Sequence, residues 1–391
     1  MDRFRIPTLA FAGALIIFFA GMWLGGHPSS LPSSLRDTFV NKNTAVRDQV
    51  IDTIERNYYR KVPRSSLDTA SLKGIVQSLN DRFSQYFTPN ESQVFNEDLN
   101  GQFAGVGISV FPDNSGLHVQ GVFAGTPAAK AGVRTGDLIV KVNGQPITGA
   151  RSRSASDLIT GKPGTVVHLT IVPRDRAKER TLAITRAKIQ VPISQGRVVS
   201  FQGVKLGVVS LSTFSADAHD KLRAQVDKVL AHGAKGLVLD LRGNGGGLLE
   251  EGRDVASTFV SKGLIVSTRG RHSPEEKLNA NGGAISPSIP MVVLVDGGTA
   301  SAAEIVTGAL RDHGRATVVG ARTFGKGVFQ EIDPLSNGGA LRLTVGRYFL
   351  PNGENLTGHG IDPQVPARDN PRTPRDEALD SALRTLRAKI S

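Results

Sequence analysis

The sequence predicts a multidomain α/β protein. Twice in the second half of the chain, at 236–242 and at 291–295, a short, mainly apolar run has the length and branching of a buried strand. Glycines follow each run, and residues with helical spacing come next. With 391 residues, the chain also exceeds what a single hydrophobic core usually organises. In such folds the site lies at the carboxyl ends of the strands, which here are the two glycine-containing turns.

The N-terminus predicts a membrane anchor. Arg3 and Arg5 precede an uncharged, largely apolar stretch at 6–26, which as a helix of about 1.5 Å rise per residue can cross a bilayer core. Residues 24–26, Leu-Gly-Gly, lack the small-x-small pattern of a cleavage site, so a signal anchor is favoured over a cleaved signal peptide. Residues 1–30 are therefore expected to form a single-pass anchor and linker in the cell membrane. The remainder of the chain is then extracytoplasmic, on the periplasmic or cell-wall side.

Residues 31–98 predict a helical N-terminal region. A helix at 45–60 and a second helix near 72–79 are expected from apolar residues at helical spacing: Val46, Val50, Ile54 and Tyr58, then Leu72, Ile75, Val76 and Leu79. The aromatic residues that follow, Phe83, Tyr86 and Phe87, are expected to pack rather than to function.

Composition excludes several functions. The absence of cysteine excludes a disulfide scaffold, a thiolate metal site and a cysteine nucleophile, and we predict no cofactor and no metal. The net charge of +12 invites a nucleic-acid partner, but the basic residues are spread along the chain without a recognition-helix, zinc-finger or RNA-binding signature. We therefore predict no nucleic-acid partner. A solvated surface that faces anionic lipid or wall polymer explains the charge more simply.

Residues 99–187 resemble a PDZ domain. Gly105, Val106, Gly107 and Ile108 are similar to the loop whose backbone N–H groups hold a terminal carboxylate in that domain. Its turn signals follow at 125–129 and at 131–137. The resemblance places Val110 in the strand to which a peptide adds, and Leu158 on the groove helix at 154–160. Gly-Val-Gly is common in tight turns, so its position ahead of the other segments makes the prediction specific.

Ser301 stands where the second predicted strand turns into a helix. The free N–H groups and the positive dipole end of such a helix favour developing negative charge, which suits a nucleophile. Ser301 and Glu304 also fit the capping box S-x-x-E, and most serines in that pattern only cap a helix. A catalytic role for Ser301 therefore depends on a base nearby.

Lys326 is the candidate base. No histidine lies in a recognisable hydrolase context, and the chain has no G-x-S-x-G motif. Lys326 lies in a glycine-flanked apolar segment, where burial would lower its pKa and let the neutral amine accept a proton. In an extended segment Gln330 points the same way as Lys326 and could hold the amine toward Ser301.

Residues 320–326 also spell G-x-x-x-x-G-K, the start of a phosphate-binding P-loop. The next residue is Gly327 instead of the Ser or Thr that holds magnesium, and an extended segment follows where a P-loop needs a helix. The ATPase interpretation is therefore rejected.

These segments resemble the C-terminal processing peptidases, also called tail-specific proteases. Residues 301–304 look like that family's S-A-S-A-S-E-I turn, and residues 323–330 are similar to its T-F-G-K-G-x-x-Q segment. The resemblance covers nearly the whole chain after the first thirty residues. It implies that Ser301 is the nucleophile, Lys326 the general base and Gln330 the residue that orients the lysine. Thr299 stands where the family usually has Ser.

The resemblance also implies the surrounding architecture. It indicates a crotonase/ClpP-like α/β catalytic domain at 188–366, an inserted PDZ domain and an N-terminal helical region that often helps to assemble homodimers. Residues 358–363 look like the family's G-x-G-I-x-P-D segment, so His359 is expected to be a loop residue and not a catalytic base. Residues 367–391 predict a terminal amphipathic helix.

Residues 240–248 resemble the family's D-L-R-x-N-P-G-G-L, with Gly245 in place of Pro. Glycines let the backbone approach a ligand closely. The N–H of Gly246 or Gly247, together with that of Ala302, is therefore predicted to form the oxyanion hole. A flexible strand-to-helix turn is the alternative interpretation of this run.

Together these features predict a membrane-anchored serine endopeptidase with a Ser-Lys dyad, whose PDZ domain recognises protein substrates by their C-termini. The alternative is a catalytically inactive PDZ scaffold that tethers envelope proteins. Turnover of an unstructured protein distinguishes the two.

Overall fold

The structure is a computed structural model that describes residues 42–100, 102–123, 125–149, 155–175, 178–190, 192–370, 373 and 375–390. The predicted anchor at 6–26 and the linker after it lie outside the described residues. Among the helices of these ranges, none combines the length and the apolar character needed to cross a membrane. The chain divides into two compact units, Met1–Tyr86 and Phe87–Ser391.

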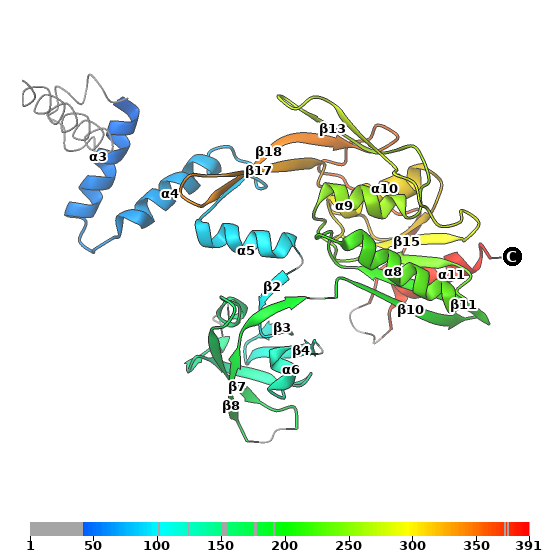
Figure 1. The fold of residues 1–391 in the computed structure, drawn as a ribbon, viewed down its shortest axis with the longest axis horizontal. Coiled ribbons are helices and arrows are strands. Elements are labelled where there is room, and N and C mark those ends of the chain that lie inside the picture. Colours follow the sequence, from blue (N-terminus) through cyan, green and yellow to red (C-terminus); the bar gives the residue numbers. More distant parts are fainter. Residues whose placement is uncertain are drawn as a thin grey trace, which may run out of the picture. The chain divides into compact units, whose positions relative to one another are not determined.

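Two helices, α3 (Lys42–Asn57) and α4 (Arg64–Gln77), make up most of the described part of the first unit (Figure 1). They confirm the two helices predicted in this region. The guanidinium of Arg64 on α4 pairs with the carboxylate of Asp52 on α3, which joins the two helices. A short strand, β1 (Gln85–Phe87), lies at the division between the units.

The second unit begins with α5 (Pro89–Leu99), a helix that the apolar spacing did not predict. Thr88 and Glu91 form a capping box at its start. The N–H of Thr88 donates to Glu91 Oε2 at 2.8 Å, and the N–H of Glu91 donates to Thr88 Oγ1 at 3.4 Å. The T-x-x-E spacing is thus the sequence signal for this helix.

A small β domain occupies the place predicted for the PDZ domain. Its main sheet has the strand order β3-β4-β5-β7-β8, with β6 paired to β5, while β2 pairs with β9 (Figure 1). The elements are β2 (Gln102–Gly105), β3 (Ile108–Asp113), β4 (Gly116–Val122), α6 (Pro127–Lys130), β5 (Leu138–Val142), β6 (Gln145–Pro146), α7 (Ser156–Ile159), β7 (Val166–Val172), β8 (Arg180–Thr185) and β9 (Ala187–Gln190). The groove helix predicted at 154–160 is observed as the shorter α7. The domain has a hydrophobic core of its own.

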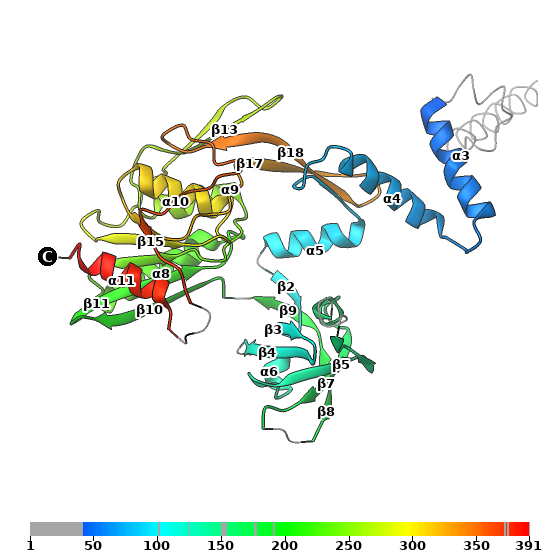
Figure 2. The same cartoon turned by 180° about the vertical axis from the view of Figure 1, so that it is seen from behind.

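The predicted α/β domain is built on a six-stranded sheet with the order β10-β11-β12-β15-β16-β19 (Figure 2). Only β10 and β11 are antiparallel to each other, and the other pairs are parallel. The strands are β10 (Ser194–Phe201), β11 (Val204–Leu211), β12 (Leu237–Asp240), β15 (Met291–Val295), β16 (Thr317–Gly320) and β19 (Val365–Pro366). The helices are α8 (Ala218–Ala231), α9 (Leu249–Ser257), α10 (Ala302–Asp312) and α11 (Glu377–Arg387).

The burial of β15 explains why its sequence is apolar at every position. Met291, Val293 and Val295 lie in one core with residues of α8, α9 and α10. Val292 and Leu294 lie in a second core with residues of α11. Successive side chains of a strand point to opposite faces, so a strand that is covered on both faces must be apolar throughout. The predicted C-terminal helix therefore covers one face of the central sheet.

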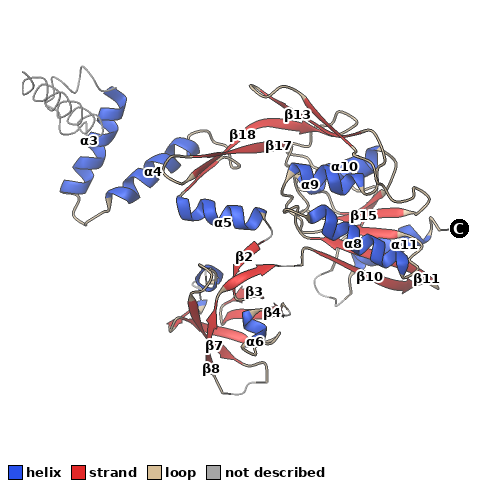
Figure 3. Cartoon of the chain, viewed as in Figure 1, coloured by secondary structure: helices blue, strands red, loops and turns tan. Residues whose placement is uncertain are grey.

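A further antiparallel sheet belongs to the same unit (Figure 3). It contains β13 (Leu264–Gly270), β14 (Glu276–Asn279), β17 (Val328–Pro334) and β18 (Ala340–Phe349). Strand β18 pairs with both β13 and β17, and β13 pairs with β14. The β17–β18 hairpin begins two residues after Lys326, so this sheet carries the end of the predicted lysine segment.

The carboxyl ends of β12 and β15 bring the two glycine-containing turns together. These strands are parallel neighbours, with Asp240 opposite Leu294. The chain leaves β12 through 241–248 and leaves β15 through 296–301. Because parallel neighbours end at the same edge of a sheet, the two turns meet there.

Candidate active site

Ser301 is the N-cap residue of α10 and has a strained backbone, with φ 57° and ψ −122°. A positive φ is uncommon outside glycine and costs on the order of 1–3 kcal/mol. Thr299, which is fully buried, holds the turn in place. Its Oγ1 donates to the carbonyl of Leu241 at 2.9 Å and accepts from the N–H of Asp296 at 3.0 Å. A sharp, strained strand-to-helix turn of this kind is typical of serine nucleophiles.

The glycine run lies directly against this turn. A Cβ atom added to Gly246 would come within 2.6 Å of Ser301 Cβ and within 2.9 Å of Ala302 N. Gly246 also has a φ of +95°, a conformation that favours glycine. A residue with a side chain at this position would therefore push the glycine run away from Ser301.

Asn244 fixes the conformation of the glycine run. Its side chain is fully buried, with Nδ2 donating to the carbonyl of Leu211 at 2.8 Å and Oδ1 accepting from the N–H of Gly246 at 2.9 Å. The carbonyl of Asn244 accepts from the N–H of Ala300 at 2.9 Å, which ties the run to the serine turn. The N–H of Gly246 is thus already engaged within the protein.

Two other N–H groups, one in the glycine run and one at the start of α10, are open. Within the ranges that the structure describes, neither Gly247 nor Ala302 donates its N–H to any acceptor. Ala302 is the first residue of α10, where the helix dipole favours negative charge. Of the two glycines predicted for the oxyanion hole, Gly247 is therefore the one with a donor available.

Glu304 connects the serine turn to the lysine segment, although it is fully buried on α10. Its Oε2 accepts the N–H of Ser301 and the N–H of Lys326, both at 2.9 Å. Its Oε1 accepts from Thr323 Oγ1 at 2.5 Å and from the N–H of Gly325 at 2.7 Å. These donors offset the cost of burying a carboxylate. Because both nitrogens contact one oxygen atom, residues 301 and 326 lie within twice 2.9 Å of each other, measured between backbone nitrogens.

The glycines on both sides of Lys326 are closely packed. A Cβ atom on Gly325 would come within 2.8 Å of Gly360 N, and one on Gly327 would come within 2.5 Å of Thr357 N. Lys326 itself is half-buried. The flanking glycines therefore let the lysine segment lie against the 357–360 loop.

Gln330 lies in β17, where the side-chain amide is held by the neighbouring strand. Its Nε2 donates to Thr344 Oγ1 of β18 at 3.1 Å. This contact fixes which way the amide faces and leaves Oε1 as an acceptor. An acceptor oxygen is what an amine needs from a residue that orients it.

The structure also shows the surroundings of two motifs that the sequence analysis had set aside, His359 and the G-x-x-x-x-G-K segment. His359 is about half exposed, with Nε2 3.3 Å from Glu354 Oε1, so it is a loop residue as expected. The G-x-x-x-x-G-K segment leads into strand β17 and not into a helix, so it lacks the P-loop geometry.

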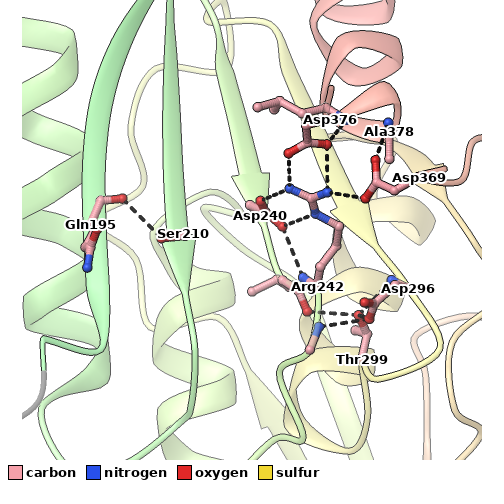
Figure 4. Close-up of polar contacts among 12 residues, drawn as sticks. Gln195, Ser210, Asp240, Arg242, Asp296, Thr299, Asp369, Asp376 and Ala378 are labelled. Atoms are coloured by element: carbon pink, nitrogen blue, oxygen red, sulfur yellow. Dashed lines mark hydrogen bonds and ion pairs between the residues drawn. The ribbon is translucent and has the colours of Figure 1, made fainter. Parts of the chain in front are cut away.

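Arg242, at the end of β12, binds three carboxylates (Figure 4). Its guanidinium lies 2.8 Å from Asp240, 2.9 Å from Asp376 and 3.0 Å from Asp369. Burial by itself lowers the pKa of Arg242, but the hydrogen bonds that its guanidinium donates to Asp240 and Asp376 outweigh burial and raise that pKa. Burial by itself raises the pKa of Asp376, and the hydrogen bonds from Arg242 and the N–H of Leu379 bring that pKa below its ordinary value. The cluster joins the segment before α11 to the end of β12.

The next residue after Arg242 extends this connection to the serine turn. The N–H of Gly243 donates to Asp296 Oδ1 at 2.8 Å, and the same oxygen accepts the N–H of Gly298 at 2.9 Å. The glycine run is therefore fixed at both ends.

The predicted carboxylate loop of the β domain is held differently. Val106 and Ile108 are buried in the core of that domain, and Gly107 has a φ of +85° with its Cβ position 2.4 Å from Thr126 Cβ. In the described part of the chain the N–H groups of Val106 and Gly107 have no acceptor. Gly105 ends β2. The loop thus has backbone N–H groups available to a ligand, while its apolar side chains are buried in the domain core.

The remaining predicted groove residues lie in the same β domain. Val110 on β3 is half-buried against its core, whereas Leu158 on α7 is 46% exposed. This core is separate from those of the α/β domain, so the structure forms two distinct candidate sites.

The roles of several residues were not predicted from the sequence. Glu304 was predicted only as a capping partner, and Asn244, Thr323 and Tyr348 were given no role. For Glu304 a signal existed, because it is the only charged residue between Ala302 and Leu310. An unpaired charge inside an otherwise apolar helix requires several hydrogen-bond donors.

Comparison with known protein families gives the class of protein. Residues 205–367 match the family model of peptidase family S41, and residues 92–172 match that of the PDZ domain. The protein is thus a serine protease, a hydrolase, with a PDZ domain.

The sequences of individual relatives identify the family within this class. The carboxy-terminal-processing protease of Bartonella bacilliformis is 35% identical over 359 residues, which cover 90% of this chain and 82% of that protein. A probable CtpA-like serine protease of Staphylococcus haemolyticus is 33% identical over 315 residues, covering 80% of this chain and 62% of that protein. The chain belongs to the carboxy-terminal-processing protease family.

Solved structures agree with this assignment. The photosystem II D1 C-terminal processing protease has a TM-score of 0.54 and 29% identity, covering 89% of this chain and 98% of that one. A putative S41 protease from Bacteroides fragilis has a TM-score of 0.58 at 19% identity, covering 87% and 97%, and so supports the fold alone. The predicted family and the predicted α/β and PDZ architecture are confirmed.

Proposed function

We propose that this protease hydrolyses peptide bonds with a dyad of Ser301 and Lys326. The observation that supports the proposal most is the shared contact with Glu304, whose Oε2 accepts the backbone N–H of both residues at 2.9 Å. The four-carbon stem of a lysine is long enough for its amine to reach a neighbouring serine across such a separation. In this proposal Gln330 orients the amine through the acceptor oxygen that Thr344 leaves open.

The proposed reaction follows from these roles. The neutral amine of Lys326 takes the proton of Ser301 Oγ as that oxygen attacks the carbonyl carbon of the scissile peptide. Negative charge develops on the carbonyl oxygen and is stabilised by the N–H groups of Gly247 and Ala302. Lys326 then gives the proton to the leaving amine as the C–N bond breaks. Water, deprotonated by the same amine, releases the acyl group as a carboxylic acid.

We also propose that the PDZ domain holds protein substrates by their C-termini. The open N–H groups of Val106 and Gly107 suit a terminal carboxylate, and the exposed Leu158 suits an apolar last side chain. Binding by the PDZ domain would raise the local concentration of the substrate near the protease domain.

Membrane anchoring and dimer formation complete the proposal. The stretch at 6–26 would anchor the chain, with the protease domain extracytoplasmic. Detection of the protein in washed membranes, with the protease domain accessible to added protease from outside the cytoplasm, would test this.

Exposed apolar residues on α3 and α4, among them Val50 and Ile75, support pairing of two copies through the N-terminal helices. Sedimentation of wild type beside a variant with both residues changed to Ser tests that pairing.

The decisive experiment compares wild type with Ser301→Ala on an unstructured protein that ends in an apolar residue. The variant should lose at least about 10⁴-fold in kcat, because removal of a serine nucleophile has effects of this size or larger. Its Tm should stay within a few degrees of wild type, since loss of a cap costs about 1 kcal/mol. Ser286→Ala, at an exposed loop serine, is the matched control.

Retained proteolysis in Ser301→Ala would contradict the dyad. An inactive wild type that still binds the C-terminus of the same protein would instead support the alternative of a PDZ scaffold.

A further inference from the structure

We infer that Tyr348 is a positioning residue for the general base, because its hydroxyl fixes the main chain of Lys326. The inference rests on the proposed dyad of Ser301 and Lys326. It concerns how the lysine is aimed and not which residues react.

The main chain of Lys326 is held on both sides of its Cα atom. The N–H of Lys326 donates to Glu304 Oε2 at 2.9 Å, and the carbonyl of Lys326 accepts a hydrogen bond from the hydroxyl of Tyr348. The backbone of a residue rotates about only two soft dihedrals, φ and ψ. The two hydrogen bonds restrain the peptide planes before and after the Cα atom of Lys326. The direction of the Cα–Cβ bond, and with it the start of the lysine side chain, is therefore set.

Tyr348 also holds the following peptide. Its backbone N–H donates to the carbonyl of Gly327 at 3.2 Å, and Asn355 Nδ2 donates to the same carbonyl at 2.7 Å. The carbonyls of Lys326 and Gly327 thus accept hydrogen bonds from the hydroxyl and from the backbone N–H of Tyr348, respectively. This arrangement attaches the lysine segment to β18 at the point where the β17–β18 hairpin begins.

The phenol is suited to act as a permanent donor. Tyr348 is the largest fully buried side chain in the described ranges. Burial, and then the negative charge of Glu304, raise the pKa of the Tyr348 phenol well above its usual range. The hydroxyl therefore stays protonated at the pH values where a catalytic lysine titrates, and a buried hydroxyl is stable only when it makes a hydrogen bond.

The test uses Tyr348→Phe, which removes only the hydroxyl, in the full chain. Tyr86→Phe, at another buried tyrosine in the first unit, is the matched control. Four quantities are measured: kcat and KM for cleavage of a peptide with a free C-terminus, and the rate and final extent of serine labelling by a fluorophosphonate. In the labelling step the serine oxygen bonds to phosphorus, fluoride leaves, and the base takes the proton.

For Tyr348→Phe we expect kcat and the labelling rate to fall about ten- to a hundredfold, the range that a small misplacement of a catalytic group produces. KM and the final extent of labelling should stay within about twofold of wild type, because folding and peptide binding are retained. Tyr86→Phe should match wild type in all four quantities.

The inference is overturned if Tyr348→Phe cleaves and labels at near-normal rates. It is also overturned if only the extent of labelling falls while the rate for each labelled molecule is normal, since that is the result of partial unfolding. Ser301→Ala tests the dyad separately. A dead Ser301→Ala with a normal Tyr348→Phe would leave the proposed function standing and remove only the role of Tyr348.

Discussion

The two glycine-containing sites of this protein are built in opposite ways. Around Ser301 the supporting side chains are polar and buried, namely Asn244, Thr299, Glu304 and Thr323. At the carboxylate loop of the PDZ domain the supporting side chains, Val106 and Ile108, are apolar, and backbone donors are left open. A reacting group must be held at a fixed distance, which buried hydrogen bonds achieve. A binding loop must instead keep its donors free for the ligand.

This comparison predicts a division of effects. Changes near Ser301 should lower kcat for every substrate. Changes in the carboxylate loop should alter KM, and only for substrates that present a free C-terminus.

After that of Ser301→Ala, the largest effect is expected for the proposed base. Lys326→Arg keeps the positive charge, but a guanidinium cannot deprotonate in a protein. We therefore expect it to lose about 10²- to 10⁴-fold in kcat, as much as Lys326→Ala, which is the range attributed to general base catalysis. For wild type, the rate should rise with pH through the apparent pKa of the lysine, because the neutral amine is the active form. Near-normal turnover by Lys326→Arg would show that this residue is only a charge partner.

The next effect separates two adjacent glycines of the same run. Gly246→Ala places a Cβ atom 2.6 Å from Ser301 Cβ and 2.9 Å from Ala302 N, at a φ of +95°. We expect about a 10²-fold loss of kcat, because this displaces the donor and the nucleophile together. Gly245→Ala is the control, since its Cβ would meet no atom within 4 Å, and it should stay within about twofold of wild type. Equal rates for the two variants would contradict the close packing inferred at Gly246.

A smaller effect is expected at the carboxylate loop. Amidation of a substrate's C-terminus removes the charge from hydrogen bonds worth roughly 1.5–3 kcal/mol. Initial rates at low substrate concentration should therefore fall about ten- to a hundredfold.

A variant of the loop provides the control for this amidation experiment. In Gly107→Ala the new Cβ would lie 2.4 Å from Thr126 Cβ, so the loop must move. Free-acid and amidated peptides should then react alike, while kcat at saturation stays normal. Equal rates for the two peptides with wild type would show that the PDZ domain does not bind C-termini during catalysis.

The smallest effect concerns pH and the carboxylates around Arg242. The pKa of Asp376 is lower in the folded protein than its ordinary value of about 4, so its pairing with Arg242 stabilises the fold above that pH. This contribution is lost as the pH falls through the folded pKa. Because Asp376 faces Asp240, Asp369 and Arg242 and is partly exposed, we expect Asp376→Asn to lower Tm by only a few degrees at pH 7.

On acidification the difference in Tm between wild type and Asp376→Asn should shrink toward zero. Thermal denaturation at pH 7 and at about pH 3 measures this change. Asp362→Asn, in a pair with Arg322 that is more than half exposed, should have no measurable effect at either pH. A constant difference for Asp376→Asn at both pH values would exclude an ionic origin.

The order of elements in the α/β domain could be predicted from the sequence because its strands and turns are marked locally. The run at 291–295 is apolar at every position because β15 is covered on both faces, and glycines follow both β12 and β15. Helix α5 was missed because its signal is a capping box and not an apolar stripe. The pairing of β13 with β18 was missed because it joins segments that lie far apart in the sequence and leave no local pattern.

The candidate reacting residues were named from local patterns, but the contacts that support the proposal came only from the tertiary structure. Ser301, Lys326 and Gln330 each lie in short motifs that the chain spells out by itself. The sequence could not show that Glu304 accepts hydrogen bonds from both the serine turn and the lysine segment, because those contacts join residues from different elements. It also left the choice between Gly246 and Gly247 open, and the side chain of Asn244 made the difference by engaging the N–H of Gly246. The physical reason is general: strand, turn and helix preferences act between near neighbours in the chain, whereas the satisfaction of buried polar groups is decided only when distant segments pack together.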